Sequence, residues 1–70
     1  MRNRIKVERA EHNLTQEELA RLVNVSRQTI NTMEANKYIP STLLALKIAR
    51  VFKKPVEEIF ILEEQDLLMN

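Results

Sequence analysis

The 70-residue sequence contains no cysteine, no glycine and no tryptophan, and these absences exclude several kinds of site. Without cysteine there is no disulfide framework and no thiolate chemistry. Without glycine there is no glycine-rich loop to hold a phosphate group. The single histidine, His12, has no second histidine or cysteine to share a metal ion, so we expect a surface turn residue. Nothing resembles a nucleophile with its base, and we expect neither an enzyme nor a cofactor.

Long apolar runs are also missing. None approaches the roughly 20 residues that span a bilayer. The basic start, MRNRIKVER, leads into no long apolar segment, which argues against a secretory signal. Apolar residues make up 44% of the chain and charged residues 30%, as in a small globular domain. We expect a single cytoplasmic domain with no membrane contact, and one too short to include a small-molecule sensor.

The charges are unevenly distributed along the chain. Residues 1–54 hold all 11 lysines and arginines and five of the ten acids, a net charge of +6. Residues 55–70 hold the other five acids and no base, a net charge of −5. This asymmetry favours a protein that turns its basic part toward a polyanion. A mixed surface with no such target is the alternative that composition leaves open.

Residues 15–23 predict a short helix with a strong start. Thr15 is a good N-cap, and Glu18 three residues later completes a capping box. An apolar face at helical spacing is expected from Leu19, Ala20, Leu22 and Val23.

A second capped helix is predicted over residues 27–35. Ser26 is its N-cap, and Ile30 and Met33 continue an inward face. The side chains left pointing outward can hydrogen-bond to base edges in a DNA major groove: Arg27, Gln28, Asn31 and Thr32.

At these residues the chain resembles the Cro/CI (Xre) family of helix-turn-helix DNA-binding regulators. The resemblance rests on TQEELA, on VSRQTI, on Glu34 and Lys37 after them, and on the Tyr-Ile-Pro-Ser segment that precedes a fourth helix. It extends over about residues 4–62. It implies an all-α, compact five-helix bundle of the lambda-repressor-like kind, in which helices 2 and 3 form the helix-turn-helix. We expect this domain to span residues 1–62 and a C-terminal tail to span 63–70.

Three turns depart from the family pattern, because asparagine stands where glycine is usual. Asn13, Asn24 and Asn36 each follow a predicted helix. Asparagine is the best non-glycine residue for a left-handed backbone, so these positions support the predicted turns. Ala35 replaces the usual asparagine of the family, which removes a side-chain phosphate contact there.

The remaining helices follow from simpler signals. The first is expected over residues 2–11, with Ile5, Val7 and the stem of Arg9 on its buried side. Pro40 and Ser41 precede the fourth helix, whose apolar residues exceed one core face, so that Leu43 is a candidate for an interface. Pro55 ends that helix and begins a short fifth one. The fifth helix is expected to turn inward Val56, Ile59 and Phe60.

The resemblance also implies roles for individual residues. Base contacts are expected from Arg27, Gln28, Asn31 and Thr32. Phosphate contacts are expected from Gln16, Thr15, Ser26, Lys37, Tyr38 and Arg4. Arg9 and Glu34 match positions that form an ion pair between the first and third helices in related repressors.

The expected function is sequence-specific binding of double-stranded DNA by a transcriptional repressor, as a homodimer on an inverted repeat. One alternative is an antitoxin-type autoregulator that also binds a protein partner through the tail. Another is a protein-interaction module of the same fold without DNA binding. Residues 61–70 leave three possibilities open: a longer last helix, a dimer contact, or a frayed terminus.

Overall fold

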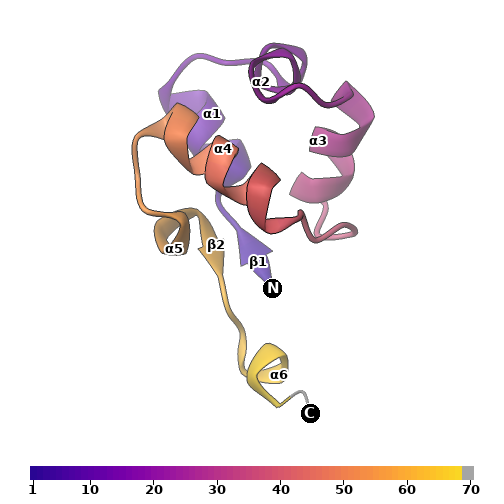
Figure 1. Ribbon diagram of the computed structural model, residues 1–70, viewed down its shortest axis with the longest axis vertical. Helices are drawn as coiled ribbons and strands as arrows, with labels where there is room; N and C mark the ends of the chain where they lie inside the picture. The colour runs from indigo at the N-terminus through magenta and orange to yellow at the C-terminus, as the bar shows by residue number, and fades with distance from the viewer. Residues whose placement is uncertain (69–70) are drawn as a thin grey trace.

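The computed structural model describes residues 1–68 of the chain and shows a small helical body with a protruding tail. The elements are β1 (Arg2–Asn3), α1 (Ile5–Glu11), α2 (Gln16–Val23), α3 (Arg27–Glu34), α4 (Thr42–Phe52), α5 (Val56–Ile59), β2 (Phe60–Ile61) and α6 (Glu64–Leu67). Helices α1 to α5 form the body, and the strands lie at one end of it (Figure 1). The predicted helical bundle with its helix-turn-helix is confirmed.

A single apolar core joins the helices of the body. Its buried side chains are Ile5, Leu19, Ala20, Val23, Ile30, Met33, Leu44, Ile48, Ala49, Phe52, Ile59 and Phe60. Each large side chain among them stabilises the fold by about 1.5–3 kcal/mol relative to exposure. Because α2, α3 and α4 all contribute, the core fixes the angle between the two helices of the helix-turn-helix.

The predicted helix starts are confirmed by hydrogen bonds. Thr15 Oγ1 accepts from the Glu18 N–H at 3.0 Å, and Glu18 Oε1 accepts from the Thr15 N–H at 2.8 Å. This bond from the Thr15 backbone lowers the pKa of the Glu18 carboxyl. Ser26 Oγ accepts from the Thr29 N–H, and Ser41 caps α4 in the same way. Each cap satisfies a donor that the first helical turn leaves without a partner.

The three asparagine turns are confirmed as left-handed. Asn13, Asn24 and Asn36 have φ values of 55°, 60° and 60°. A fourth position, Lys53 at φ 57°, also adopts this conformation and ends α4. Lysine has no side-chain preference for this region, and the sequence therefore gave no signal of it.

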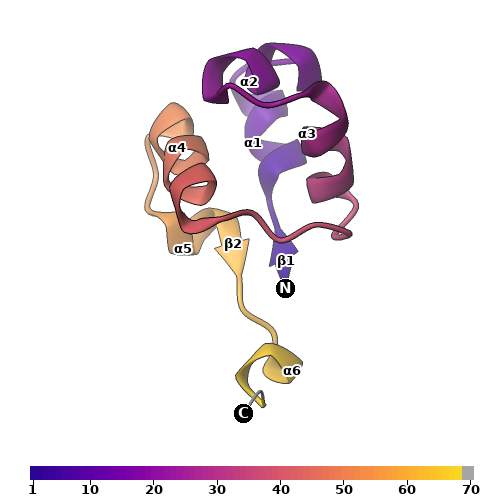
Figure 2. The same cartoon turned by 45° about the vertical axis from the view of Figure 1, so that its right-hand side comes forward.

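The first helix begins later than predicted, and the residues before it form a strand. Arg2 and Asn3 pair antiparallel with Ile61 and Phe60. Asn3 Oδ1 then accepts from the Ile5 N–H at 3.1 Å, which starts α1 at Ile5 instead of Arg2. The short sheet ties the two ends of the domain together, as Figure 2 shows.

Two predicted core residues are exposed. Val7 is 43% exposed, because it lies two positions from the buried Ile5 and cannot share its face. Leu22 is 61% exposed. Successive residues of a helix are rotated by about 100°, so Leu22 points roughly 110° away from the centre of the buried face of α2. Both predictions relied on the hydrophobicity of the residue, whereas its position around the helix determines whether it is buried.

A charged residue, and not Val7, lies on the buried side of α1. Glu8, three residues after Ile5, is only 1% exposed. Its Oε2 accepts from Lys54 Nζ at 2.7 Å, which raises the pKa of the Lys54 ammonium. Glu8 Oε1 has no hydrogen-bond partner within residues 1–68. The pair connects α1 to the segment between α4 and α5.

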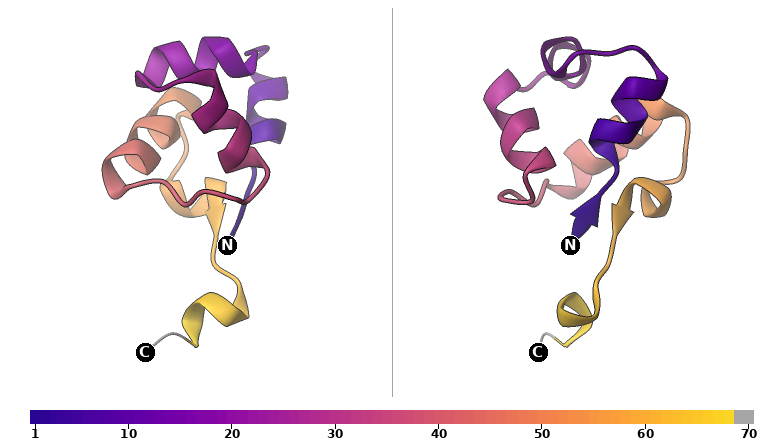
Figure 3. Two further views of the ribbon diagram at one scale, coloured as in Figure 1. Left: turned by 90° about the vertical axis from the view of Figure 1, so that its right-hand side faces the viewer. Right: turned by 180° about the vertical axis from the view of Figure 1, so that it is seen from behind.

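The chain leaves the body through strand β2, and the tail that follows it forms one helical turn, α6. Phe60 is buried as predicted but belongs to β2, so the tail does not extend the last helix. Helix α6 stands apart from the body in both views of Figure 3. The Met1 ammonium holds it by ion pairs with Glu63 at 3.0 Å and Asp66 at 3.1 Å, and these partners raise the pKa of the amine. Met69 and Asn70, also assigned to the tail, lie outside the described residues.

Candidate nucleic-acid interface

The outer side of α3 presents polar side chains because its inner side is fixed in the core. Ile30 and Met33 are both 0% exposed. Arg27, Gln28 and Asn31 consequently lie on the solvent side, and all three are exposed. Arginine, glutamine and asparagine are the side chains that form paired hydrogen bonds with bases in the major groove.

Thr32 lies one helical turn after Gln28 and is less accessible. Its side chain is half-buried. Its Oγ1 lies 3.0 Å from the Gln28 carbonyl oxygen and 3.1 Å from that of Thr29, so the hydroxyl proton is directed at the helix backbone. Such back-bonding leaves the methyl group and the oxygen lone pairs for any outside partner.

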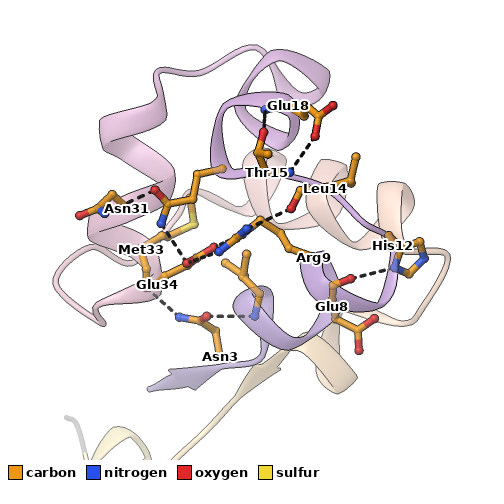
Figure 4. A network of polar contacts seen from close by, with 12 residues as sticks. Asn3, Glu8, Arg9, His12, Leu14, Thr15, Glu18, Asn31, Met33 and Glu34 are labelled. Carbon is orange, nitrogen blue, oxygen red and sulfur yellow. Dashed lines mark hydrogen bonds and ion pairs between the residues drawn. The ribbon is translucent and has the colours of Figure 1, made fainter.

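An ion pair connects α1 to the end of α3. Arg9 Nε donates to Glu34 Oε2 at 2.6 Å, and Arg9 Nη2 donates to Glu34 Oε1 at 3.1 Å (Figure 4). The two side chains are only 15% and 8% exposed. The bond to Glu34 raises the pKa of the Arg9 guanidinium. Arg9 Nη1 also donates to the Leu14 carbonyl at 3.0 Å, which fixes the loop before α2.

Gln16 joins this ion pair to the exposed side of α3. Its Nε2 donates to Glu34 Oε1 at 3.0 Å. Its Oε1 accepts from Asn31 Nδ2 at 3.5 Å, the longest contact of the network. Sequence reasoning predicted the Arg9–Glu34 pair but missed the part played by Gln16, because contacts between helices leave no spacing pattern in one sequence.

The loop after α3 is held from two sides. The Lys37 N–H donates to the Thr32 carbonyl at 2.9 Å, which closes the end of the helix. Asn3 Nδ2 lies 2.8 Å from the Met33 carbonyl and 3.1 Å from Asn36 Oδ1. Asn3 was not predicted to have this role. The loop therefore presents the exposed Lys37 on a fixed backbone.

The other predicted phosphate ligands are divided between two regions. Thr15 and Ser26 are exposed at the starts of α2 and α3. Tyr38, 44% exposed, lines a shallow pocket with Asn24 and Val25 of the helix-turn-helix turn. Arg4 instead lines a pocket with Arg2, Asn3, Val7 and Ile61, beside the strands. Arg4 thus lies beside the strands.

Comparison with known proteins bears on this geometry. A helix-turn-helix family model matches residues 5–59, which is most of the chain. The chain belongs to the helix-turn-helix family. This family is that of Cro/CI-type DNA-binding domains and is not an enzyme family.

Relatives match this helix-turn-helix chain over nearly their whole length. A protein of Archaeoglobus fulgidus is 57% identical, over 96% of this chain and 94% of its own. A protein of Methanocaldococcus jannaschii is 53% identical, over 94% of this chain and all of its own. The YgzD protein of Bacillus subtilis is 44% identical, with the same coverage. Each is named an uncharacterized HTH-type transcriptional regulator.

The described part of this helix-turn-helix chain gives no support for a metal site or a membrane-spanning helix. No group of three His, Cys, Asp or Glu side chains within residues 1–68 could hold a metal ion. No helix in that range is long and apolar enough to cross a membrane. His12 is exposed, and its ring lies 5.2 Å from that of Phe52.

Proposed function

We propose that this helix-turn-helix protein is a transcriptional regulator that binds a specific sequence of double-stranded DNA. The observation that carries the proposal is the exposed side of α3, where Arg27, Gln28 and Asn31 project from a helix whose other side is fixed in the core. The relatives named as regulators support the same function.

In this proposal α3 reads the bases and its surroundings hold the phosphates. Arg27 and Gln28 lie at the start of α3, the end that enters the major groove in this motif. Arginine pairs with guanine and glutamine with adenine, each at about 1–3 kcal/mol of discrimination. Thr15, Ser26 and Gln16 at the helix starts, with Lys37 and Tyr38 in the loop, contact phosphates. These contacts position the protein and make binding depend on salt.

We further propose that the protein acts as a homodimer. Exposed apolar side chains on α4 and over residues 62–68 are more numerous than a monomer requires: Leu43, Leu46, Leu62, Leu67 and Leu68, each at least 53% exposed. A standard interface buries about 800 Å² per partner. The whole surface is 5123 Å², so a dimer contact would cover about a sixth of it.

Repression then follows from steric exclusion. A dimer places two α3 helices about 34–36 Å apart, one turn of DNA, and so reads an inverted repeat. A promoter that contains this repeat is covered and closed to polymerase.

A second candidate function is suggested by the tail itself. Leu67 and Leu68 are 69% and 73% exposed on a helical turn that stands away from the body. An autoregulator that also binds a protein partner would use such a segment. Capture of a co-encoded protein by the full chain, and its loss on replacement of both leucines by serine, would favour this function.

Selection from a random duplex library at near-physiological salt tests the proposed function. Enrichment of an inverted repeat with half-sites one helical turn apart is the expected result. Enrichment of single half-sites would contradict the dimer, and no enrichment would contradict sequence-specific binding.

Sedimentation without DNA tests the dimer separately. Replacement of Leu67 and Leu68 by serine should shift the protein toward monomer. Leu22→Ser is the matched control, because Leu22 is similarly exposed at 61% but lies on α2. An equal shift for both variants would refute a dimer contact through the tail.

A further inference from the structure

One chain of hydrogen bonds runs from the interior to the base-reading side of α3. Arg9 donates to Glu34, Gln16 donates to the same carboxylate, and Asn31 donates to Gln16. It begins at a carboxylate that is 8% exposed and ends at an exposed amide. Figure 4 shows Arg9, Glu34 and Asn31 along this path.

The chemistry of the carboxylate fixes the direction of every bond in this chain. An ionised carboxylate only accepts hydrogen bonds, so the Gln16 group that faces Glu34 must be its NH₂. The Gln16 carbonyl oxygen then faces the other way, toward Asn31. Because that oxygen also only accepts, Asn31 must turn its own NH₂ to Gln16.

This polarity leaves Asn31 with a defined hydrogen-bonding edge. One Nδ2 proton is directed at Gln16, so Oδ1 and the second Nδ2 proton remain for an outside partner. An acceptor beside a donor is the pattern with which asparagine binds N6 and N7 of adenine. A reversed Gln16 amide would offer its NH₂ to Asn31 and draw Oδ1 away from the groove.

We propose that Glu34 is a positioning residue for base reading, which acts through Gln16 to orient the amide of Asn31 and so gives Asn31 a preference for adenine. The inference rests on the proposed function, since it concerns how the same α3 surface reads DNA. Glu34 would then have two roles: it forms the ion pair with Arg9, and it contributes to the choice of DNA sequence.

The test uses four variants of the full chain in the same library selection. Asn31→Ala identifies the base position that Asn31 reads. Gln16→Met removes the connecting amide, together with the proposed phosphate contact of Gln16, and leaves the ion pair intact. Glu34→Gln replaces the acceptor with a group that can face either way. Glu17→Gln is the control, because it removes the same charge from an exposed neighbour of Gln16.

The wild type should prefer adenine at the Asn31 position by about 5- to 150-fold, the range for a paired amide–base contact. Gln16→Met and Glu34→Gln should each lower that preference at least about twofold, as contacting side chains usually couple by that much. Preferences at the positions that Arg27 and Gln28 read should stay as they were. Glu17→Gln should leave every base preference unchanged.

A structural role alone would give a different result. Gln16→Met and Glu34→Gln would then lower the melting temperature or the affinity for all sequences, and the base preference would remain that of the wild type. That outcome would overturn the proposal, as would an Asn31→Ala variant that loses preference at no position. Failure of the wild type to enrich any sequence would instead overturn the proposed function, and this inference with it.

Discussion

Replacement of Glu8 by leucine is expected to stabilise the protein, although it removes one partner of an ion pair. Glu8 is 1% exposed, and its Oε1 has no hydrogen-bond partner within the described residues. An unsatisfied buried polar atom costs about 1–3 kcal/mol. Lys54, with 34% of its side chain exposed, can remain hydrated without Glu8.

The magnitude follows from these two effects. Glu8→Leu removes the desolvation cost and loses an attraction to a cation that water partly screens. Leucine has a similar volume and fits the core position. We expect the free energy of unfolding to rise by about 1 kcal/mol, which is about 4–8 °C in melting temperature for a domain of this size.

Lys54→Met should have the opposite effect, because it leaves the carboxylate buried without its donor. Thermal unfolding followed by circular dichroism measures both variants. Glu11→Leu is the control: it makes the same change at a position that is 55% exposed and should stay within about 0.5 kcal/mol of the wild type. A Glu8→Leu variant as unstable as Lys54→Met would refute the reasoning.

Three further predictions concern other parts of the chain. Lys53→Gly should raise the free energy of unfolding by about 0.5–1 kcal/mol, because glycine adopts φ 57° without strain. Lys47→Gly, inside α4, should instead lower the free energy of unfolding by about 1 kcal/mol. Urea titration measures both variants. Lys37→Ala should weaken binding to all DNA sequences alike and reduce the slope of log K against log salt by about 0.9, as the loss of one phosphate contact requires; an unchanged slope would remove Lys37 from the interface. The ion pairs of Met1 should hold α6 between about pH 4 and 8. Glu63 and Asp66 raise the pKa of the amine above 8.0, so its contribution is complete below that value and is lost as the pH rises through the raised pKa. The Glu63 N–H and, to a smaller extent, the amine lower the pKa of Asp66 below 3.8, so the contribution of Asp66 is complete above that value and is lost as the pH falls through the lowered pKa. Amide chemical shifts of α6 should report both transitions by NMR, and acetylation of the amine should remove the contact at every pH.

The parts of the fold that local chemistry determines could be predicted from the sequence. A capping box needs only two residues three positions apart, and Thr15 and Glu18 form it as expected. Asparagine after each of three helices predicted the left-handed turns. Inward residues such as Ile30 and Met33 followed from helical spacing.

The features that the sequence did not reveal depend on residues far apart. Strand β1 pairs Asn3 with Phe60, and two-residue strands are too short to show alternation. Burial of Glu8 depends on Lys54, 46 positions later, and hydrophobicity alone favoured Val7 instead.

The candidate site divides in the same way. Which side chains of α3 face outward followed from its inward face, so Arg27, Gln28 and Asn31 could be named from the sequence. The hydrogen bonds that connect Asn31 to Gln16 and Glu34 could not, because these three residues meet only when α2 packs on α3. The assigned base and phosphate contacts remain predictions.

The most direct test of the central claim is the ratio of two dissociation constants, measured at about 0.15 M salt. One is for the duplex that the library selection yields, and the other is for an unrelated duplex of the same length. A sequence-specific regulator should bind the selected duplex at least about 10³-fold more tightly. A ratio near one, with both affinities falling equally as salt is raised, would contradict sequence-specific recognition by α3.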